Sequence, residues 1–382
     1  MALSQGVKIK KMDKSKAAGV TPQAIEGKVP APVYPLKFNG IFKESPWGGD
    51  RLRKIFGKDT PQGNKIGESW EIVDRGHDNS LVTNGPCRGT TLHELMELRP
   101  AELLGVGGDE AVGLPPTRFP LLVKFLDVTD RLSLQVHPDD AYTREAGEEG
   151  GGKTEAWYVI QAELGSWIVY GLSPGVSLES FEERLRRGDQ LGIESCLNFL
   201  SVRPGDTIFI PPGTLHAAGG GLLLLEVQQN SDLTYRVYDW GSNRPLHLEK
   251  ALEVMKAVGG RPCTTGVHGR PTVSHPCPEA SRDRSSALST AESDGGVIEL
   301  LLECKEFIME RLCLEGTYEV VRSDCHVLTF IKGSGDIYYG EGERLEAHAG
   351  DNVLIPAVLK GYCIQPKDRC KIVRTSLTSQ WL

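Results

Sequence analysis

The stretch PGDTIFIPPGTLHA, residues 204–217, indicates the fold more strongly than any other part of the chain. Gly205–Asp206 is typical of a tight hairpin turn, and the apolar run TIFI that follows is typical of a buried strand. The segment Pro211–Gly213 then redirects the backbone. We therefore expect His216 to point into the interior of a β barrel.

Short runs that resemble strands surround this stretch and are separated by Gly, Pro and Asp clusters, as in an all-β domain. They are SWEIV (69–73), FPLLVKFLDV (119–128), LSLQVH (132–137) and AWYVI (156–160). Three stretches, residues 91–105, 177–191 and 246–258, have the spacing of amphipathic helices, and Thr91 and Ser177 are placed to cap the first two. These patterns predict a mainly β fold with a few packing helices.

The pattern of Gly205–Asp206, TIFI and Pro211 recurs as Gly350–Asp351, NVLI and Pro356. The Gly, Pro, Gly and His spacing of the first copy is the second sequence motif of the cupins, so the recurrence predicts two jelly-roll barrels. In the second copy, Val358 stands at the place of Gly213 and Gly361 at the place of His216. The second barrel is therefore expected to lack metal ligands and to serve as a structural part, a lid or an interface.

The sequence predicts four parts. We expect a flexible, Lys-rich tail over residues 1–31 and a catalytic cupin domain with helical decorations over residues 32–260. Residues 261–296 are rich in Pro, Ser, Thr and Arg and have no apolar periodicity, which indicates a linker or long loop. Residues 297–382 again alternate apolar and polar positions between Gly turns and form the predicted C-terminal jelly roll.

A metal site is predicted inside the first barrel. In the strand-like run LSLQVH the period of two places Gln135 and His137 on the same face. Glu155 begins the next strongly β run, and His216 ends the motif quoted above. One amide oxygen, two imidazoles and one carboxylate suit zinc and are acceptable to iron, cobalt or manganese.

Charge and cysteine usage limit the other classes of function. The net charge is −8 and the isoelectric point is near 5.7, which makes nucleic acid and anionic membranes poor partners. No run approaches the roughly 18 apolar residues of a membrane span, and the N-terminus has no secretory signal. The nine cysteines contain no C-x-x-C pair, so we expect reduced thiols and a cytoplasmic protein.

At the level of a family, the chain resembles the type I phosphomannose isomerases in their short bacterial-style form. The resemblance covers about residues 34–256 and is carried by PWGG (46–49), IGESWEI (66–72), FPLLVKFLD (119–127), LSLQVHPDD (132–140), GKTEAWYV (152–159), PPGTLHA (211–217) and QQNSDLTYRVYDWG (228–241). It implies one zinc ion on Gln135, His137, Glu155 and His216, although a water could replace Gln135. It also implies the interconversion of mannose 6-phosphate and fructose 6-phosphate through an enediol, by a monomer or homodimer.

The resemblance also assigns roles in the pocket. Arg236 corresponds to the active-site arginine of the family, and Asp232 and Lys153 to nearby pocket residues. Arg236 would stabilise developing negative charge, and Lys153 is the candidate for proton relay, with phosphate binding as its alternative role. Lys124, Lys153 and Arg236 are the basic residues available to bind the substrate phosphate.

Two other functions remain open at this stage. A cupin oxygenase would bind iron and usually shows an HxH pair where this chain has Gln135 and His137. A sugar-binding cupin without catalysis would keep the barrel but would not need Arg236, Asp232 and Lys153. Metal analysis together with an isomerase assay separates these possibilities.

Overall fold

A computed structural model describes residues 29–105, 116–255, 290–293 and 295–381 of the chain. The predicted flexible tail lies outside the described residues up to position 28, and the predicted linker lies outside them up to position 289. Within the described ranges the molecule consists mainly of antiparallel strands, with short helices at the edges. The fold class expected from the sequence, mainly β with packing helices, is confirmed.

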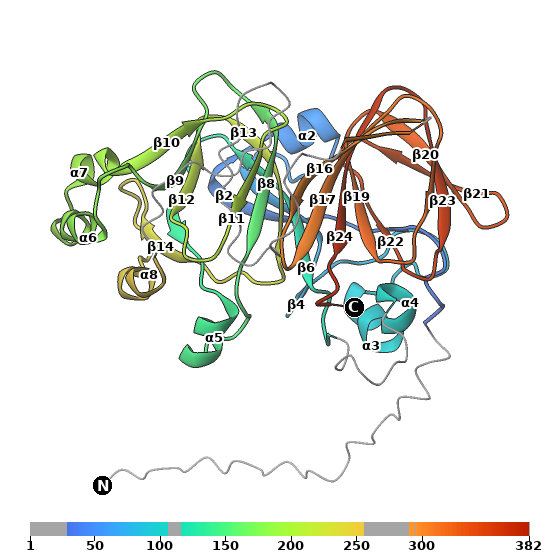
Figure 1. Ribbon diagram of the computed structural model, residues 1–382, viewed down its shortest axis with the longest axis horizontal. Helices are drawn as coiled ribbons and strands as arrows, with labels where there is room; N and C mark the ends of the chain where they lie inside the picture. Colours follow the sequence, from blue (N-terminus) through green and yellow to red (C-terminus); the bar gives the residue numbers. More distant parts are fainter. Residues whose placement is uncertain (1–28, 106–115, 256–289, 294, 382) are drawn as a thin grey trace, which may run out of the picture.

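Two barrel-like halves lie side by side (Figure 1), and each combines a larger with a smaller antiparallel sheet. This is the arrangement expected of two jelly-roll barrels. In the N-terminal half, the six-stranded sheet contains β2 (Ile41–Gly49), β3 (Ile66–Ile72), β6 (Leu121–Val128), β8 (Glu155–Ala162), β11 (Thr207–Ile210) and β13 (Leu222–Gln229). The five-stranded sheet contains β7 (Leu134–Val136), β9 (Trp167–Leu172), β10 (Leu197–Ser201), β12 (His216–Gly219) and β14 (Tyr235–Tyr238).

The C-terminal half repeats this plan. Its seven-stranded sheet contains β1 (Leu36–Lys37), β15 (Thr290–Ser293), β16 (Gly296–Glu303), β17 (Phe307–Leu314), β19 (His326–Lys332), β22 (Asn352–Ile355) and β24 (Cys370–Leu377). Its four-stranded sheet contains β18 (Tyr318–Val321), β20 (Ser334–Tyr339), β21 (Glu343–His348) and β23 (Gly361–Pro366). A two-stranded ribbon, β4 (Asp74–Arg75) with β5 (Asp78–Asn79), lies outside both halves.

The strand order shows that the two halves are related over a whole sheet. The order β11-β8-β13-β6-β3-β2 in the first half matches β22-β19-β24-β17-β16-β15 in the second. The pair Ile210↔Glu155 in the first sheet corresponds to Ile355↔His326 in the second. The repeat that the sequence indicates in two short motifs therefore extends to the paired strands around them.

The alternation of side chains along each strand separates three hydrophobic layers in the N-terminal half. On β8, Trp157 and Val159 face the barrel interior, whereas Ala156 and Tyr158 face the core shared with the C-terminal half. The outer face of the five-stranded sheet packs against α6 (Leu178–Arg187), α7 (Gln190–Ser195) and α8 (Leu248–Val254). The interior of this barrel is thus enclosed by packed layers on two sides.

The predicted helices form, but with different ends. The stretch 91–105 contains two helices, α3 (Leu92–Leu98) and α4 (Pro100–Leu104), because Pro100 starts a new helix and does not continue the first. The capping box at Thr91 is present. The stretch 177–191 ends its helix α6 at Gly188, which is in the left-handed conformation. Of the stretch 246–258, residues 256–258 lie outside the described part.

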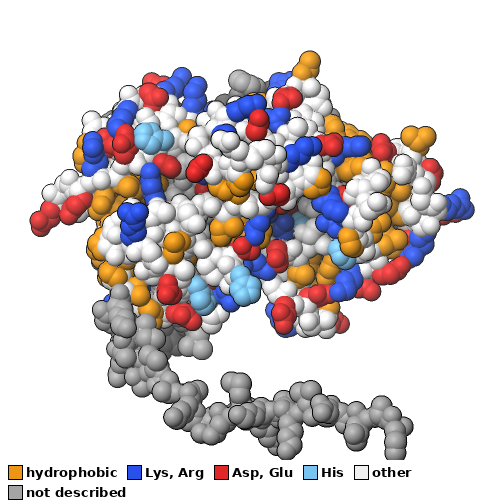
Figure 2. All heavy atoms as spheres, turned by 180° about the vertical axis from the view of Figure 1, so that it is seen from behind, with side chains coloured by type: hydrophobic (Ala, Val, Ile, Leu, Met, Phe, Trp, Pro, Cys, Tyr) orange, Lys and Arg blue, Asp and Glu red, His pale blue; other side chains and the backbone are white. Residues whose placement is uncertain are grey.

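Short helices also occur at two places where the sequence pattern carries little signal. They are α2 (Arg51–Phe56) and α5 (Asp140–Ala146), the latter capped by Asp139. In the described part of the chain, no helix is long and apolar enough to cross a membrane. Acidic and basic side chains are interspersed over the face of the molecule that Figure 2 shows.

Contacts cross the predicted boundaries between the parts. β1 pairs with β22 of the C-terminal half, although it precedes the first barrel in sequence. Val29 is buried and its carbonyl accepts hydrogen bonds from Arg99. β15 lies inside the segment 261–296 expected to be a linker. Residues at the end of the segment predicted to be a tail and of the segment predicted to be a linker are therefore part of the folded structure.

Candidate metal centre

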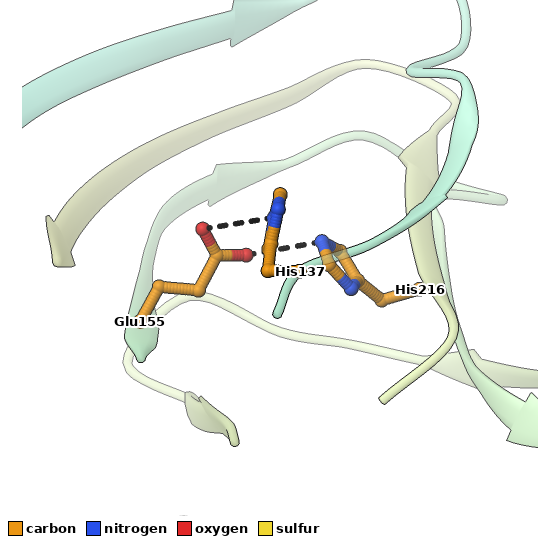
Figure 3. Close-up of side chains that lie close together, drawn as sticks. All are labelled: His137, Glu155 and His216. Atoms are coloured by element: carbon orange, nitrogen blue, oxygen red, sulfur yellow. Dashed lines mark ion pairs between the residues drawn. The ribbon is translucent and has the colours of Figure 1, made fainter. Parts of the chain in front are cut away.

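Three strands bring the predicted ligands together inside the N-terminal barrel. His216 on β12 pairs directly with Gln135 on β7, and Glu155 begins β8 in the opposite sheet. His137 follows the end of β7. Figure 3 shows the side chains of His137, Glu155 and His216 pointing toward one another across the interior. Their ligand atoms all lie within 4.8 Å of one another.

The carboxylate of Glu155 lies between the two imidazoles. Its Oε1 is 3.1 Å from His216 Nε2, and its Oε2 is 3.6 Å from His137 Nε2. All three side chains are buried. Burial lowers the pKa of His137 to about 3, with Lys153 as the next cause, so this imidazole is held neutral and able to bind a metal.

Backbone carbonyls fix which ring nitrogen of each histidine is free. His137 Nδ1 is 2.8 Å from the carbonyl oxygen of Leu233, and His216 Nδ1 is 2.9 Å from that of Thr214. Because a carbonyl oxygen can only accept, each Nδ1 carries the hydrogen and each Nε2 presents a lone pair to the centre. Metal-binding histidines are commonly oriented in this way.

Both carboxylate oxygens of Glu155 are fully buried and take part in no hydrogen bond, and Oε2 forms an ion pair with Lys153 Nζ at 2.8 Å. Burial alone would raise the pKa of Glu155, but the nearby Lys153 and the two histidines outweigh it and hold that pKa well below its usual value. Lys153 pairs with Oε2, but Oε1 faces His216 Nε2 without a hydrogen bond, and a metal ion at this place would satisfy that buried oxygen. Together with the two Nε2 lone pairs, this donor set fits a divalent metal ion.

Gln135 lies beside the three other residues, with its amide reversed relative to metal binding. Its Nε2 is 3.2 Å from His216 Nε2, and its Oε1 accepts a 3.4 Å hydrogen bond from Ser133. A half-turn of the amide would exchange the two atoms and present Oε1 to the centre. The position of Gln135 is therefore compatible with the predicted ligand role.

A cavity of about 390 Å³ opens beside this centre. Gln135 and Lys153 form part of its wall next to the metal ligands, and Trp47 and Trp70 contribute aromatic surface. Its remaining charged lining residues are Glu68, Lys124, Glu226, Asp232, Arg236 and Arg244. The cavity therefore joins the candidate metal centre to every residue that the sequence assigned to catalysis or substrate binding.

Lys153 and Lys124 are linked through a buried carboxylate that the sequence did not suggest. Lys153 Nζ is 2.8 Å from Glu155 Oε2 and 3.5 Å from Glu226 Oε1. Lys124 Nζ is 3.0 Å from the same oxygen of Glu226 and 3.2 Å from Glu68 Oε2. Burial raises the pKa of Glu226, and the nearby charge of Glu155 adds to this effect.

The pKa of Lys124 is raised, because the attraction of Glu226 and Glu68 outweighs the opposing effect of burial. The sequence patterns did not identify Glu226 or Glu68 as residues of the site. The only available signal was a charged residue within an apolar strand, as in LLLLEVQQ (222–229). Their partners are on neighbouring strands and could not be identified from spacing alone.

Arg236 and Asp232 also line the cavity. The Arg236 Nη1 donates to the carbonyl oxygen of Pro245 at 2.8 Å, and its Nε is buried without a hydrogen-bond partner. Burial lowers the pKa of Arg236, as does neighbouring Arg244. The Asp232 side chain is 57% exposed and pairs with Arg75.

The C-terminal barrel has a different side chain at the place of Glu155. The strand pairing puts His326 there, and both of its ring nitrogens are engaged. Its Nδ1 is 2.9 Å from the carbonyl oxygen of Asp324, and its Nε2 is 2.7 Å from the Tyr362 hydroxyl. Within the described ranges, the cluster of side chains that could hold a metal ion is His137, Glu155 and His216 of the N-terminal barrel.

The chain is similar to known proteins over most of its length. The model of the family "phosphomannose isomerase type I, catalytic domain" matches residues 36–152. The chain is 34% identical over 340 residues to the probable mannose-6-phosphate isomerase GmuF of Bacillus subtilis, covering 87% of this chain and 96% of that protein. It is 33% identical over 339 residues to a mannose-6-phosphate isomerase of Streptococcus mutans, covering 86% and 94%.

The chain is also similar to a solved structure. The crystal structure of the mannose 6-phosphate isomerase from Bacillus subtilis matches with a TM-score of 0.74 and 32% sequence identity. The match covers 89% of this chain and 99% of that protein. Since the relatives are matched over nearly their whole length, the likeness includes both barrels.

Proposed function

Because the chain belongs to the type I phosphomannose isomerase family, we propose that it interconverts mannose 6-phosphate and fructose 6-phosphate. One observation carries the proposal: a single cavity lined by Gln135, Lys153 and Arg236 lies beside the cluster of His137, Glu155 and His216. An aldose-ketose isomerase needs groups that polarise a carbonyl, move a proton and bind an anion. This cavity offers candidates for all three.

The proposed metal is one zinc ion per chain, held by His137, Glu155 and His216 with Gln135 as the fourth protein ligand. The donor set of two imidazoles, a carboxylate and an amide suits zinc. When bound, a divalent metal supplies Lewis-acid polarisation of substrate oxygens. The buried carboxylate of Glu155, whose Oε1 has no hydrogen bond, and the two Nε2 lone pairs support this assignment.

For the proton transfer between C2 and C1, we propose Lys153 as the relay. It lines the cavity and touches the ligand shell, with its Nζ 3.2 Å from His137 Nε2. Glu155 is a poor candidate because its oxygens face the metal ligands. The second carboxylate partner of Lys153 is Glu226, whose raised pKa suits it to take up a proton that the amine passes on.

Arg236 is proposed to stabilise the negative charge of the enediolate and to bind the substrate. Its buried Nε, free of protein partners, supports this role. Lys124 is also proposed to bind the substrate. The substrate would have to compete with Glu226 and Glu68, because these carboxylates already pair with the Lys124 ammonium. Asp232 is proposed to position the substrate from the exposed rim of the cavity, where it pairs with Arg75.

The test is a coupled isomerase assay on the purified protein, with the metal measured in the same sample. We expect turnover of mannose 6-phosphate without oxygen, one zinc per chain, loss of activity with a chelator and recovery with zinc. Folded protein that keeps its metal but gives no turnover would favour a sugar-binding cupin. Iron in the site together with oxygen consumption would favour a cupin oxygenase.

A further inference from the structure

A chain of hydrogen bonds joins the two segments that carry the candidate ligands. The amide of Gly152 donates to Asp140 Oδ1 at 2.7 Å. The other oxygen of Asp140, Oδ2, accepts from Gln229 Nε2 at 3.1 Å, and Gln229 Oε1 accepts from the amide of Thr154 at 2.8 Å. The same two side chains therefore hold the backbone on both sides of Lys153.

This chain of bonds lies where the metal centre is assembled. Asp140 follows His137 by three positions, and Gly152 and Thr154 precede Glu155 by three positions and by one. Between them, the amide of Lys153 donates to the carbonyl oxygen of Pro138 at 3.0 Å. Three successive backbone amides, at positions 152 to 154, are thus held by groups that follow His137 or lie at the end of β13.

The two segments approach each other closely, and the donor and acceptor of each hydrogen bond that Gln229 makes are fixed. A Cβ atom at Gly152 would lie 2.5 Å from the amide nitrogen of Asp140, so the two segments meet without room for a side chain. Gln229 is buried, with 6% of its surface exposed. Its amide orientation is set from both ends, because Asp140 can only accept and the Thr154 amide can only donate.

Helix capping does not account for Asp140. The cap of α5 is the preceding residue, Asp139, which accepts from the amide of Tyr142 at 2.8 Å. The carboxylate of Asp140 is committed to Gly152 and Gln229 instead. A purely local role in the helix would leave these two long-range hydrogen bonds unexplained.

We propose that Asp140 and Gln229 are positioning residues for the metal centre. They act through the backbone of residues 152–154 and fix where Glu155 and Lys153 lie relative to His137. Neither is a member of the ligand cluster or lines the cavity. The inference rests on the metal site of the proposed function, but its readout is metal affinity, which does not depend on the identity of the substrate.

The test exchanges the carboxylate and the amide between positions 140 and 229. In Asp140→Asn, an amide NH₂ faces the Gln229 NH₂, and turning the Gln229 amide would set its NH₂ against the Thr154 amide. In Gln229→Glu, two carboxylates face each other. In the double variant, the amide introduced at position 140 can donate its NH₂ to the carboxylate introduced at position 229. That carboxylate still accepts from Thr154, and the amide oxygen at position 140 still accepts from Gly152.

We expect each single variant to bind zinc about 10- to 100-fold more weakly, as measured by competition with a chelator. The double variant should return to within about threefold of the unchanged protein, because the coupled pair is restored. The matched control is Asp189→Asn, which alters a carboxylate that accepts from the amide of Gly192 at the cap of α7. It should leave zinc affinity unchanged.

Other results overturn the proposal. One is single variants that bind zinc as tightly as the control, and another is a double variant that binds no better than the weaker single one. If a single variant does not fold, as judged by circular dichroism, the double variant decides, and its failure to fold or to bind zinc also counts against the proposal. Zinc binding without isomerase activity would instead contradict the proposed function and leave this test intact.

Discussion

At the residue scale, the positions of the candidate ligands follow from local sequence patterns. The period of two in LSLQVH places Gln135 and His137 on one face, and the turn and proline of PGDTIFIPPGTLHA direct His216 inward. Glu226 and Glu68 could not be found in this way. Their role depends on Lys124, which reaches them from a neighbouring strand. The sequence of a single strand does not show which strand lies beside it.

Arg236→Ala should lower kcat by about 100- to 1,000-fold, the usual cost of removing one preorganised donor to a developing negative charge. The zinc content should not change, because Arg236 bonds to Pro245 and to none of the three clustered ligands. The measurements are steady-state kinetics and metal analysis of the same preparation. As a control, Arg187→Ala removes an arginine whose side chain is 73% exposed and should keep full activity. Loss of zinc from Arg236→Ala would contradict the assigned role.

At the scale of the element, the starts of two helices were predictable because N-capping is local: Thr91 and Ser177 cap their helices with side chains that accept from nearby amides. The helix ends were predicted less well, since α6 ends at Gly188 in the left-handed conformation. Strand ends were less predictable. In the stretch YRVYDW (235–240), β14 ends at Tyr238, its register shifts between Arg236 and Tyr238, and Trp240 has a φ of 52°. A bulge of this kind depends on the partner strand.

Thr91→Ala should lower the free energy of unfolding by about 1 kcal/mol, the typical cost of losing an N-cap. Thr91 accepts from the amide of Glu94, whose side chain returns a bond to the Thr91 amide. The helix begins with Leu92, which is fully buried in the core shared by the two barrels. Denaturant unfolding measures the change, and Thr91→Ser should keep most of the stability. A change in KM for the substrate in either variant would contradict a purely structural role.

At the scale of the whole molecule, the sequence predicted two barrels but not how firmly they are joined. One hydrophobic cluster includes Leu36, Phe125 and Phe307, which come from the N-terminal segment and from both halves. β1 adds a strand to the C-terminal sheet, and the side chain of Arg311 in β17 donates to the carbonyl oxygen of Gly205. These contacts link residues far apart in sequence, so periodicity within any one segment could not reveal them.

The related sheets also show which charged side chains stand at corresponding positions inside the two barrels. Where Lys124 pairs with Glu226 across β6 and β13, the corresponding strands pair Glu310 with Arg374, so that the charges are exchanged. Arg374 Nε donates to Glu310 Oε2 at 2.8 Å. The ion pair persists with opposite polarity although His326 stands at the position of Glu155. This supports a structural role for the C-terminal barrel, in which His326 and the pair of Glu310 with Arg374 take the positions of Glu155 and of the pair of Lys124 with Glu226.

The shared core leads to a prediction for metal removal. If the two barrels unfold together, zinc bound in the first stabilises both, because any ligand that binds only the folded state shifts the whole transition. Free zinc at about 1,000 times its dissociation constant contributes about 4 kcal/mol, which for a chain of this length corresponds to a rise in Tm of roughly 5 °C. Calorimetry should show a single transition that moves as a unit when a chelator is added.

Glu155→Ala provides the control, because the chain then lacks the buried carboxylate of the metal cluster and its transition should be insensitive to the chelator. Two separate transitions, of which only one responds to zinc, would show that the barrels unfold independently. That result would mean that the packing of β1 on β22 and of Arg311 on the Gly205 turn contributes too little to couple them. A single transition that shifts with zinc would instead extend the effect of the metal centre to the barrel that has no ligands of its own in the described residues.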